Sequence, residues 1–280
     1  MAEAQIPATG TELPASEGTI GTTNLSVDAA PHPLANLIPP ELLSNLLAAS
    51  KHKARSQETH EQIHLPTLLA NKPIKLLLLG DSMFERFKTT GVNTPLGPSN
   101  APYPDVFNAG VGGDRISNII YRLGRPQGLL ECLTGCGGAG YVFLEMGTND
   151  LGDGKRPLRE QDVESYKLVL ETLRIVCGEK LRAIVVCGLN MKKRIKRDGV
   201  VEGSNEMLKK LVEEMKSEWQ ELGTVIDYLE ADPEIIDHLE EDGVHLDEKG
   251  YEIFGARLWG RYGELRSRLE ASVADGDLRH

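Results

Sequence analysis

Short apolar stretches that alternate with helical patterns constrain the fold of this chain more than any other feature of its sequence. The first stretch, at 74–80, is a continuous apolar run that ends in glycine, which is typical of a strand buried on both faces. Similar stretches lie at 105–110, 141–147, 181–189 and 224–229. Helical patterns lie between and after them, at 115–123, 160–176, 204–222 and 248–269.

Strands that alternate with helices of this length pair in parallel through crossover connections. We therefore predict an α/β fold, a three-layer α/β/α sandwich with a central parallel sheet of about five strands. Ligands of such sheets bind beyond the carboxyl ends of the strands. The unusual residues of this chain fall at those ends, so we looked for a site there.

The N-terminal part of the chain has a different composition. Residues 1–35 are rich in Ala, Pro, Thr, Ser and Gly without periodicity, so they cannot bury enough apolar surface to offset the entropy lost on ordering. We predict a disordered extension over 1–70, in which an amphipathic stretch at 39–50 could form a short helix that docks on the domain or binds a partner. The folded domain is expected at 71–272, with a flexible tail at 273–280.

The composition makes several kinds of partner unexpected. The 42 acidic and 31 basic residues give a formal charge of −11, which disfavours binding to nucleic acid and to anionic membranes. No apolar run is long enough to predict a membrane span, and the N-terminus lacks the basic and apolar regions of a secretory signal. We therefore expect a cytoplasmic protein whose four cysteines are reduced thiols. Cys132 and Cys136 would be half of a zinc site, but no second Cys/His pair at ligand spacing accompanies them.

Ser82 directly follows the first predicted strand, in the segment Gly80-Asp81-Ser82-Met83. A hydroxyl at this position would lie at the edge of the sheet near a helix N-terminus, which favours a nucleophile. Helix capping by the same residues is an equally good interpretation of this segment alone. The nucleophile elbow of α/β-hydrolases needs glycine two residues after the serine, where this chain has Phe84, so that fold is disfavoured.

The next two predicted strands also end in unusual residues. A glycine-rich turn at 108–114 could expose a backbone N–H to a ligand, although a simple tight turn fits as well and the spacing does not match a dinucleotide fingerprint. Asn149 follows the third strand and could direct its amide at a developing oxyanion. Asparagine at such a place also favours turns for local reasons.

Asp242 and His245 stand three residues apart before the last helical pattern. At this spacing the carboxylate can accept from one imidazole nitrogen, which fixes the tautomer and leaves the other nitrogen basic. A surface salt bridge or a simple turn would explain the pair too, and a metal site would have only His238 as a nearby further ligand. Each segment is weak alone, but four such segments at the strand ends favour one shared catalytic site.

Taken together, the segments GDSM, NAGVGGD, GTND and DGVHL resemble the four sequence blocks of the SGNH (GDSL-like) hydrolase family. They stand at 80–83, 108–114, 147–150 and 242–246, and the resemblance runs from about residue 74 to 262. The second block and the helix after it most resemble the intracellular platelet-activating-factor acetylhydrolase-like branch. The family resemblance implies an SGNH, flavodoxin-like sandwich.

By this resemblance, Ser82 is the nucleophile, His245 the general base and Asp242 its orienting partner. The oxyanion hole would consist of the N–H of Ser82, the N–H of Gly113 and the side chain of Asn149. The resemblance implies a serine esterase that cleaves small short-acyl, acetyl-type esters through an acyl-enzyme, with no metal and no organic cofactor. A carbohydrate O-acetyl esterase and a non-catalytic binding module with the same fold are the alternatives.

Other properties stay open at this level. A homodimer and a protein partner for the N-terminal segment are both compatible with the sequence. The basic run at 192–197 fits a solvated loop better than a patch that attracts an anionic substrate group.

Overall fold

The computed structural model describes residues 31–70, 74–98, 106–151, 155–190 and 199–274. Its centre is a sheet of five parallel strands in the order β2-β1-β3-β4-β5. This is the flavodoxin-like order, in which the chain direction along the sheet switches next to β1. The strands are β1 (Ile74–Gly80), β2 (Val106–Asn108), β3 (Ala139–Glu145), β4 (Ala183–Cys187) and β5 (Val225–Leu229).

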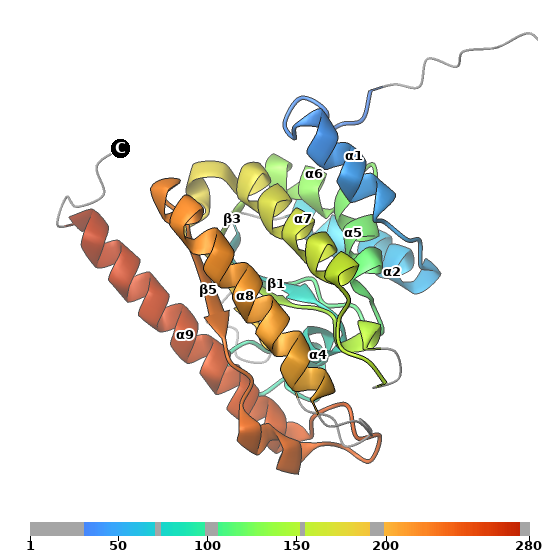
Figure 1. The fold of residues 1–280 in the computed structure, drawn as a ribbon, viewed down its shortest axis with the longest axis vertical. Helices are drawn as coiled ribbons and strands as arrows, with labels where there is room; N and C mark the ends of the chain where they lie inside the picture. Colours follow the sequence, from blue (N-terminus) through green and yellow to red (C-terminus); the bar gives the residue numbers. More distant parts are fainter. Residues whose placement is uncertain (1–30, 71–73, 99–105, 152–154, 191–198, 275–280) are drawn as a thin grey trace, which may run out of the picture. The chain divides into compact units, whose positions relative to one another are not determined.

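Helices cover both faces of the sheet, which gives the predicted three-layer α/β/α sandwich (Figure 1). One face packs against α5 (Ile116–Gly124), α6 (Leu129–Gly135), α7 (Glu160–Cys177) and α8 (Val200–Glu221). The other packs against α4 (Ser82–Glu85) and α9 (Glu248–Ala274). Short 3-10 helices lie between these elements, namely η2 (Arg86–Lys88), η3 (Thr148–Asp150), η4 (Gly178–Lys180) and η5 (Pro233–His238).

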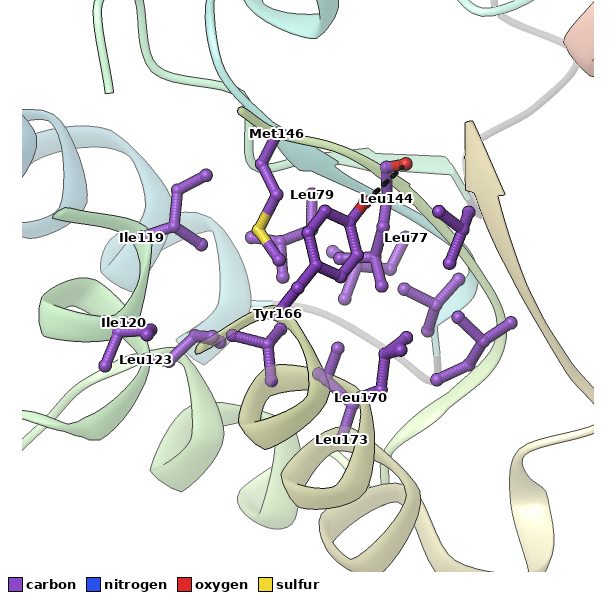
Figure 2. Close-up of a cluster of buried hydrophobic side chains, with 14 of the residues drawn as sticks. Leu77, Leu79, Ile119, Ile120, Leu123, Leu144, Met146, Tyr166, Leu170 and Leu173 are labelled. Atoms are coloured by element: carbon purple, nitrogen blue, oxygen red, sulfur yellow. Dashed lines mark hydrogen bonds between the residues drawn. The ribbon is translucent and has the colours of Figure 1, made fainter. Parts of the chain in front are cut away.

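The run of four leucines in β1, Leu76 to Leu79, follows from burial on both faces, whereas Lys75 near the start of the strand is exposed. Leu77 and Leu79 belong to the core on the α5 and α7 side, where Figure 2 shows them facing Tyr166 of α7. Leu76 and Leu78 point to the opposite face and belong to the core that contains Phe254 of α9. Since side chains alternate along a strand, a strand between two helical layers needs apolar residues at every buried position.

The predicted strands and long helices agree with the structure to within a few residues, apart from α6, which the sequence patterns did not predict. The first residue of the stretch at 105–110 lies outside the described residues, as does the basic run at 192–197. None of the helices in the described part of the chain combines the length and the apolar character that crossing a membrane requires.

The prediction of disorder up to residue 70 was wrong for 32–70, which form a helical segment on the α5 and α7 side of the domain. This segment consists of α1 (Pro40–Ala48), α2 (Ala54–Thr59), a π-helical turn η1 (His60–His64) and α3 (Leu65–Leu69). The helix expected at 39–50 corresponds to α1, whose Leu43 and Leu46 are buried in the main core. Composition could not reveal this, because the apolar face is covered only by tertiary contact. Residues 1–30 and 275–280 lie outside the description, and α9 continues through 273–274.

Candidate active site

Ser82 is the first residue of α4, two positions after the last residue of β1. Asp81 caps this short helix, since its Oδ1 accepts the backbone N–H of Met83 at 3.0 Å. Gly110 packs directly against the same turn, where a Cβ would come within 2.4 Å of the backbone nitrogen of Glu85. The glycine loop therefore packs closely against the turn that carries Ser82, and only 7% of the surface of Ser82 is exposed.

His245 lies on the loop that joins η5 to α9. An isolated antiparallel bridge between Leu239 and Leu246 closes this loop. The backbone N–H of Glu240 also donates to the carbonyl of His245 at 2.7 Å. These backbone hydrogen bonds within the loop fix the position of the His245 side chain at the edge of the sheet.

Asp242 orients that imidazole. Its Oδ2 lies 2.5 Å from Nδ1 of His245, and its Oδ1 accepts the backbone N–H groups of Val244 and His245 at 2.8 and 2.9 Å. Partial burial opposes ionisation of Asp242, but these hydrogen bonds outweigh it and hold the pKa of the carboxyl well below its usual range. Asp242 is therefore an anion that accepts from the imidazole.

The structure brings Ser82 and His245 together although they are 163 residues apart in the chain. Oγ of Ser82 lies 2.9 Å from Nε2 of His245, which is hydrogen-bonding distance. With Nδ1 facing the Asp242 carboxylate, Nε2 can accept the proton of the serine hydroxyl. The three side chains form a continuous chain of hydrogen bonds, which is the geometry that nucleophilic catalysis by serine requires.

Gly113 lies on the loop after β2 with a φ of +71°, and it is exposed. Within the described residues, no hydrogen bond uses the backbone N–H of Gly113 or of Ser82. Both residues line the same pocket.

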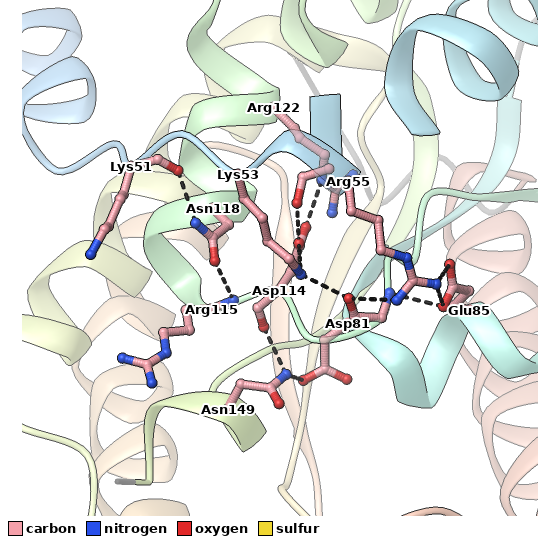
Figure 3. A network of polar contacts seen from close by, with 12 residues as sticks. Lys51, Lys53, Arg55, Asp81, Glu85, Asp114, Arg115, Asn118, Arg122 and Asn149 are labelled. Atoms are coloured by element: carbon pink, nitrogen blue, oxygen red, sulfur yellow. Dashed lines mark hydrogen bonds and ion pairs between the residues drawn. The ribbon is translucent and has the colours of Figure 1, made fainter. Parts of the chain in front are cut away.

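Asn149 lies at η3, after β3, and is used differently from the expectation. Its Nδ2 donates to Oδ2 of Asp81 at 3.1 Å and to the carbonyl of Asp114 at 2.9 Å (Figure 3). These two bonds use both amide hydrogens. In this arrangement Asn149 ties the serine turn to the glycine loop, and it could donate to a substrate only by releasing one of these acceptors.

The pocket beside Ser82 and His245 has a volume of about 520 Å³. Several of its lining side chains carry charge, and sequence reasoning identified none of them as site residues. Among the described residues, the lining consists of Arg55, Ser82, Glu85, Arg86, Lys88, Thr89, Gly112, Gly113 and His245. Arg55 comes from the N-terminal helical segment, and no local sequence signal connects that segment with a glycine loop far along the chain.

A metal ion is the alternative use of this region. Glu240, Asp242 and His245 offer ligand atoms that lie within 4.8 Å of one another. Both imidazole nitrogens already have partners, however, so a bound ion would have to displace Ser82 or Asp242. Cys132 is not part of that group, and burial raises the pKa of its thiol to about 11, which disfavours the thiolate that a metal needs.

A second cavity in the described part of the chain, of about 720 Å³, contains none of the predicted site residues. It lies beside α3 and α6 and includes Leu34, Leu68 and Cys132 in its lining. Its size alone does not make it the reactive site, because no nucleophile–base pair lines it.

Residues 76–258, more than half of the chain, match the family described as GDSL-like lipase/acylhydrolase. The chain therefore belongs to this family, the SGNH hydrolases, as its four sequence blocks predict. Family membership makes the chain a hydrolase of the esterase class. No curated protein sequence matches the chain.

Solved structures with the same fold include a GDSL-like lipase from Bacteroides thetaiotaomicron, which is 12% identical with a TM-score of 0.53 over 73% of this chain and 97% of that one. A putative acylhydrolase from Bacteroides fragilis is 13% identical, with a TM-score of 0.51 over 77% of this chain and 99% of that one. A structure described as a putative platelet activating factor from Streptococcus pneumonia is 20% identical, with a TM-score of 0.45 over 79% and 97% of the two chains. The first two similarities agree with the α/β/α fold, and the acetylhydrolase-like branch stays a prediction.

Proposed function

We propose that this chain is a serine esterase that hydrolyses short-acyl, acetyl-type carboxylic esters through an acyl-enzyme. Ser82 is the nucleophile, His245 the general base and Asp242 the residue that orients and stabilises the imidazole. The observation that carries this proposal is the hydrogen-bonded chain from Ser82 Oγ to His245 Nε2 at 2.9 Å and from His245 Nδ1 to Asp242 at 2.5 Å.

In the first half of the reaction, Ser82 Oγ bonds to the ester carbonyl carbon while its proton passes to Nε2 of His245. The carbonyl oxygen becomes an anion, which the N–H groups of Ser82 and Gly113 stabilise. The bond between the carbonyl carbon and the alcohol oxygen then breaks. The alcohol leaves with the proton from His245, and the acyl group stays on Ser82.

Water completes the cycle. His245 takes a proton from the water as its oxygen attacks the acyl carbon, and the same two N–H groups stabilise the second oxyanion. The bond to Ser82 Oγ breaks, Oγ recovers the proton from His245, and the acid leaves. Asn149 contributes as a third donor if it exchanges its bond to Asp81 for one to the substrate oxygen.

The pocket supports small substrates. About 520 Å³ of partly open space holds a short acyl group and a modest alcohol, and no aromatic side chain is in its described lining. Stacking on an aromatic face would favour the carbohydrate O-acetyl esterase alternative, but Trp219 is buried at 1% exposure, Trp259 packs against Tyr262 of α9, and neither is in the described lining of the pocket. A small ester substrate is therefore the better fit.

The test is hydrolysis of p-nitrophenyl esters from acetate to octanoate by the wild type and by Ser82→Ala, with circular dichroism as the check on folding. We expect activity to be highest on the shortest esters and to disappear in S82A. A fluorophosphonate probe should label the wild type at Ser82. Unchanged turnover by S82A would refute the serine mechanism, and a folded wild type that neither turns over nor reacts with the probe would favour the non-catalytic module.

A further inference from the structure

The peptide group between Gly112 and Gly113 has unusual partners. Its N–H belongs to Gly113 and is directed at the pocket of Ser82 in the proposed mechanism. Its carbonyl belongs to Gly112. In a trans peptide these two groups point in opposite directions, so whatever holds the carbonyl also decides where the N–H points.

Two cationic side chains hold that carbonyl. Nζ of Lys53 donates to the Gly112 oxygen at 2.8 Å, and Nη1 of Arg55 donates to the same oxygen at 3.0 Å. Both residues lie at the start of α2 in the N-terminal helical segment, and Lys53 and Arg55 precede the glycine by 59 and 57 residues. Charged donors form stronger hydrogen bonds than neutral ones, and two of them on one oxygen polarise the peptide toward a more acidic N–H.

The backbone N–H of Gly112 also has a charged hydrogen-bond partner. Its own N–H donates to Oε2 of Glu85 at 2.9 Å, and Glu85 accepts both bonds from Nη2 of Arg55 at 2.9 and 3.0 Å. A Cβ on Gly112 would lie 2.5 Å from Oε2 of Glu85 and 2.6 Å from Nη1 of Arg55. A side chain at position 112 would therefore have to displace the ends of Glu85 and Arg55.

Asp114 in turn positions Lys53. Its carboxylate is completely buried, and its Oδ1 accepts from Lys53 Nζ at 3.0 Å and from the hydroxyl of Ser56 (Figure 3). Arg122 occupies the other carboxylate oxygen. The lysine that reaches Gly112 is therefore held by a buried acceptor.

We propose that Lys53 and Arg55 are positioning residues for the oxyanion hole, holding the Gly112–Gly113 peptide so that the N–H of Gly113 faces the reacting oxygen. This proposal rests on the proposed function, because it assigns a role in stabilising the oxyanion. It makes the N-terminal helical segment part of the catalytic apparatus. The two cations act on the transition state through the peptide and do not touch the substrate carbonyl.

The test compares Lys53→Met, Arg55→Met and the double variant with the matched control Lys51→Met, using p-nitrophenyl acetate. Lys51 belongs to the same segment and carries the same charge, but its side chain is exposed and makes no described contact with the glycine loop. Loss of a whole oxyanion donor costs about 10²–10³-fold in kcat, so we expect about 10-fold for each single variant and up to about 10²-fold for the double variant. KM should stay within about twofold, and K51M should match the wild type.

A readout on the peptide itself separates positioning from a general structural role. In protein labelled with 15N-glycine, the amide proton signal of Gly113 should move upfield in K53M and R55M and stay in place in K51M. The conservative variants Lys53→Arg and Arg55→Lys keep a charged donor and should recover most of kcat. Thermal unfolding is measured for all variants, and R55M removes an exposed side chain, so it should fold.

The outcomes separate the two proposals. If S82A is inactive while the K53M/R55M double variant keeps wild-type kcat and an unchanged Gly113 signal, the positioning role is wrong and the esterase mechanism stands. If the variants raise KM without lowering kcat, the cations bind substrate and the positioning role is again wrong. If S82A is fully active, the esterase mechanism itself is refuted.

Discussion

Arg122 and Asp114 form an ion pair in which neither side chain is exposed to solvent. Nε of Arg122 lies 2.8 Å from Oδ2 of Asp114, and the guanidinium also donates to the carbonyls of Ala109 at 2.9 Å and Gly80 at 3.3 Å. Gly80 is the last residue of β1, and Ala109 directly follows β2. The pair thus joins the ends of two strands to the loop that carries Gly113.

Replacing Arg122 by methionine should lower the free energy of unfolding by about 3–5 kcal/mol, because it leaves the buried Asp114 without its main counter-ion. Lys53 and Ser56 still bond to the carboxylate, which favours the lower end of that range. Urea denaturation measures the loss. The control Lys210→Met breaks an exposed helical pair and should cost less than about 0.5 kcal/mol. A loss below about 1 kcal/mol in R122M would contradict the prediction.

His64 should make the fold sensitive to acid. It is 1% exposed, its ring packs edge-on against Phe107, and neither ring nitrogen has a hydrogen-bond partner among the described residues. Burial lowers the pKa of His64 to about 2. Because the unfolded chain binds this proton more readily, the stability that His64 contributes at neutral pH is lost as the pH falls below its unfolded pKa of about 6.5.

We therefore expect His64→Phe to reduce the loss of unfolding free energy between pH 7 and pH 5 by about 2 kcal/mol. Guanidinium denaturation at the two pH values measures it. His52 is exposed, so His52→Gln should leave the pH dependence as in the wild type. Identical pH dependence in H64F and the wild type would show that the folded state tolerates a charged His64.

Asp150 should have the opposite pH dependence. Burial raises the pKa of its carboxyl to about 6, although a hydrogen bond from the backbone N–H of Ile116 partly opposes the shift. A folded-state pKa above the unfolded value means that the protonated form stabilises the fold below about pH 4, and that this stability is lost as the pH rises through 6. Asp150→Asn keeps an acceptor for Ile116 and cannot ionise.

Relative to the wild type, D150N should therefore gain about 2 kcal/mol of unfolding free energy on going from pH 4 to pH 7. Chemical denaturation at both pH values gives this difference of differences. Equal changes in the two proteins would mean that Asp150 ionises in the folded state without cost.

Asp242→Asn should lower kcat on p-nitrophenyl acetate by about 10³–10⁴-fold. The amide that replaces Oδ2 would donate to Nδ1 of His245 and force the hydrogen onto Nε2, which could then no longer accept the proton of Ser82. The adjacent Glu241 is exposed, so Glu241→Gln should keep wild-type kcat and control for lost charge. Activity of D242N within tenfold of the wild type would exclude this role for Asp242.

Much of the fold could be predicted from the sequence because both faces of the sheet are covered. The strand expected at 74–80 has the observed bounds, since its four consecutive leucines, Leu76 to Leu79, report burial on two sides. The convergence of the first three segments also follows from topology, because parallel strands end at one edge, whereas the fourth lies on the loop between η5 and α9. The helix α6 was missed because Leu129–Gly135 is too short to establish a helical period.

The hydrogen-bond partners of the side chains in and around the site could not be predicted from the sequence in the same way. The amide of Asn149 bonds to Asp81 and to the carbonyl of Asp114, an arrangement that depends on loop conformations and not on residue type. Lys53 and Arg55 fell within the extension that the sequence predicted to be disordered, because their acceptor is a backbone carbonyl that leaves no signature in the sequence. Side chains that bond to distant backbone are visible only in three dimensions.

Lys53 and Arg55, which contact the glycine loop, come before β1 in the sequence. Their position bears on which residues the functional unit must include. The family match begins at residue 76, so it contains Ser82, Asp242 and His245 but excludes Lys53 and Arg55. A chain trimmed to the match would keep the hydrogen-bonded side chains of Ser82, His245 and Asp242. It would lose both side chains that donate to the Gly112 carbonyl. Under the proposed positioning role of Lys53 and Arg55, the family match covers a smaller unit than the catalytic apparatus does.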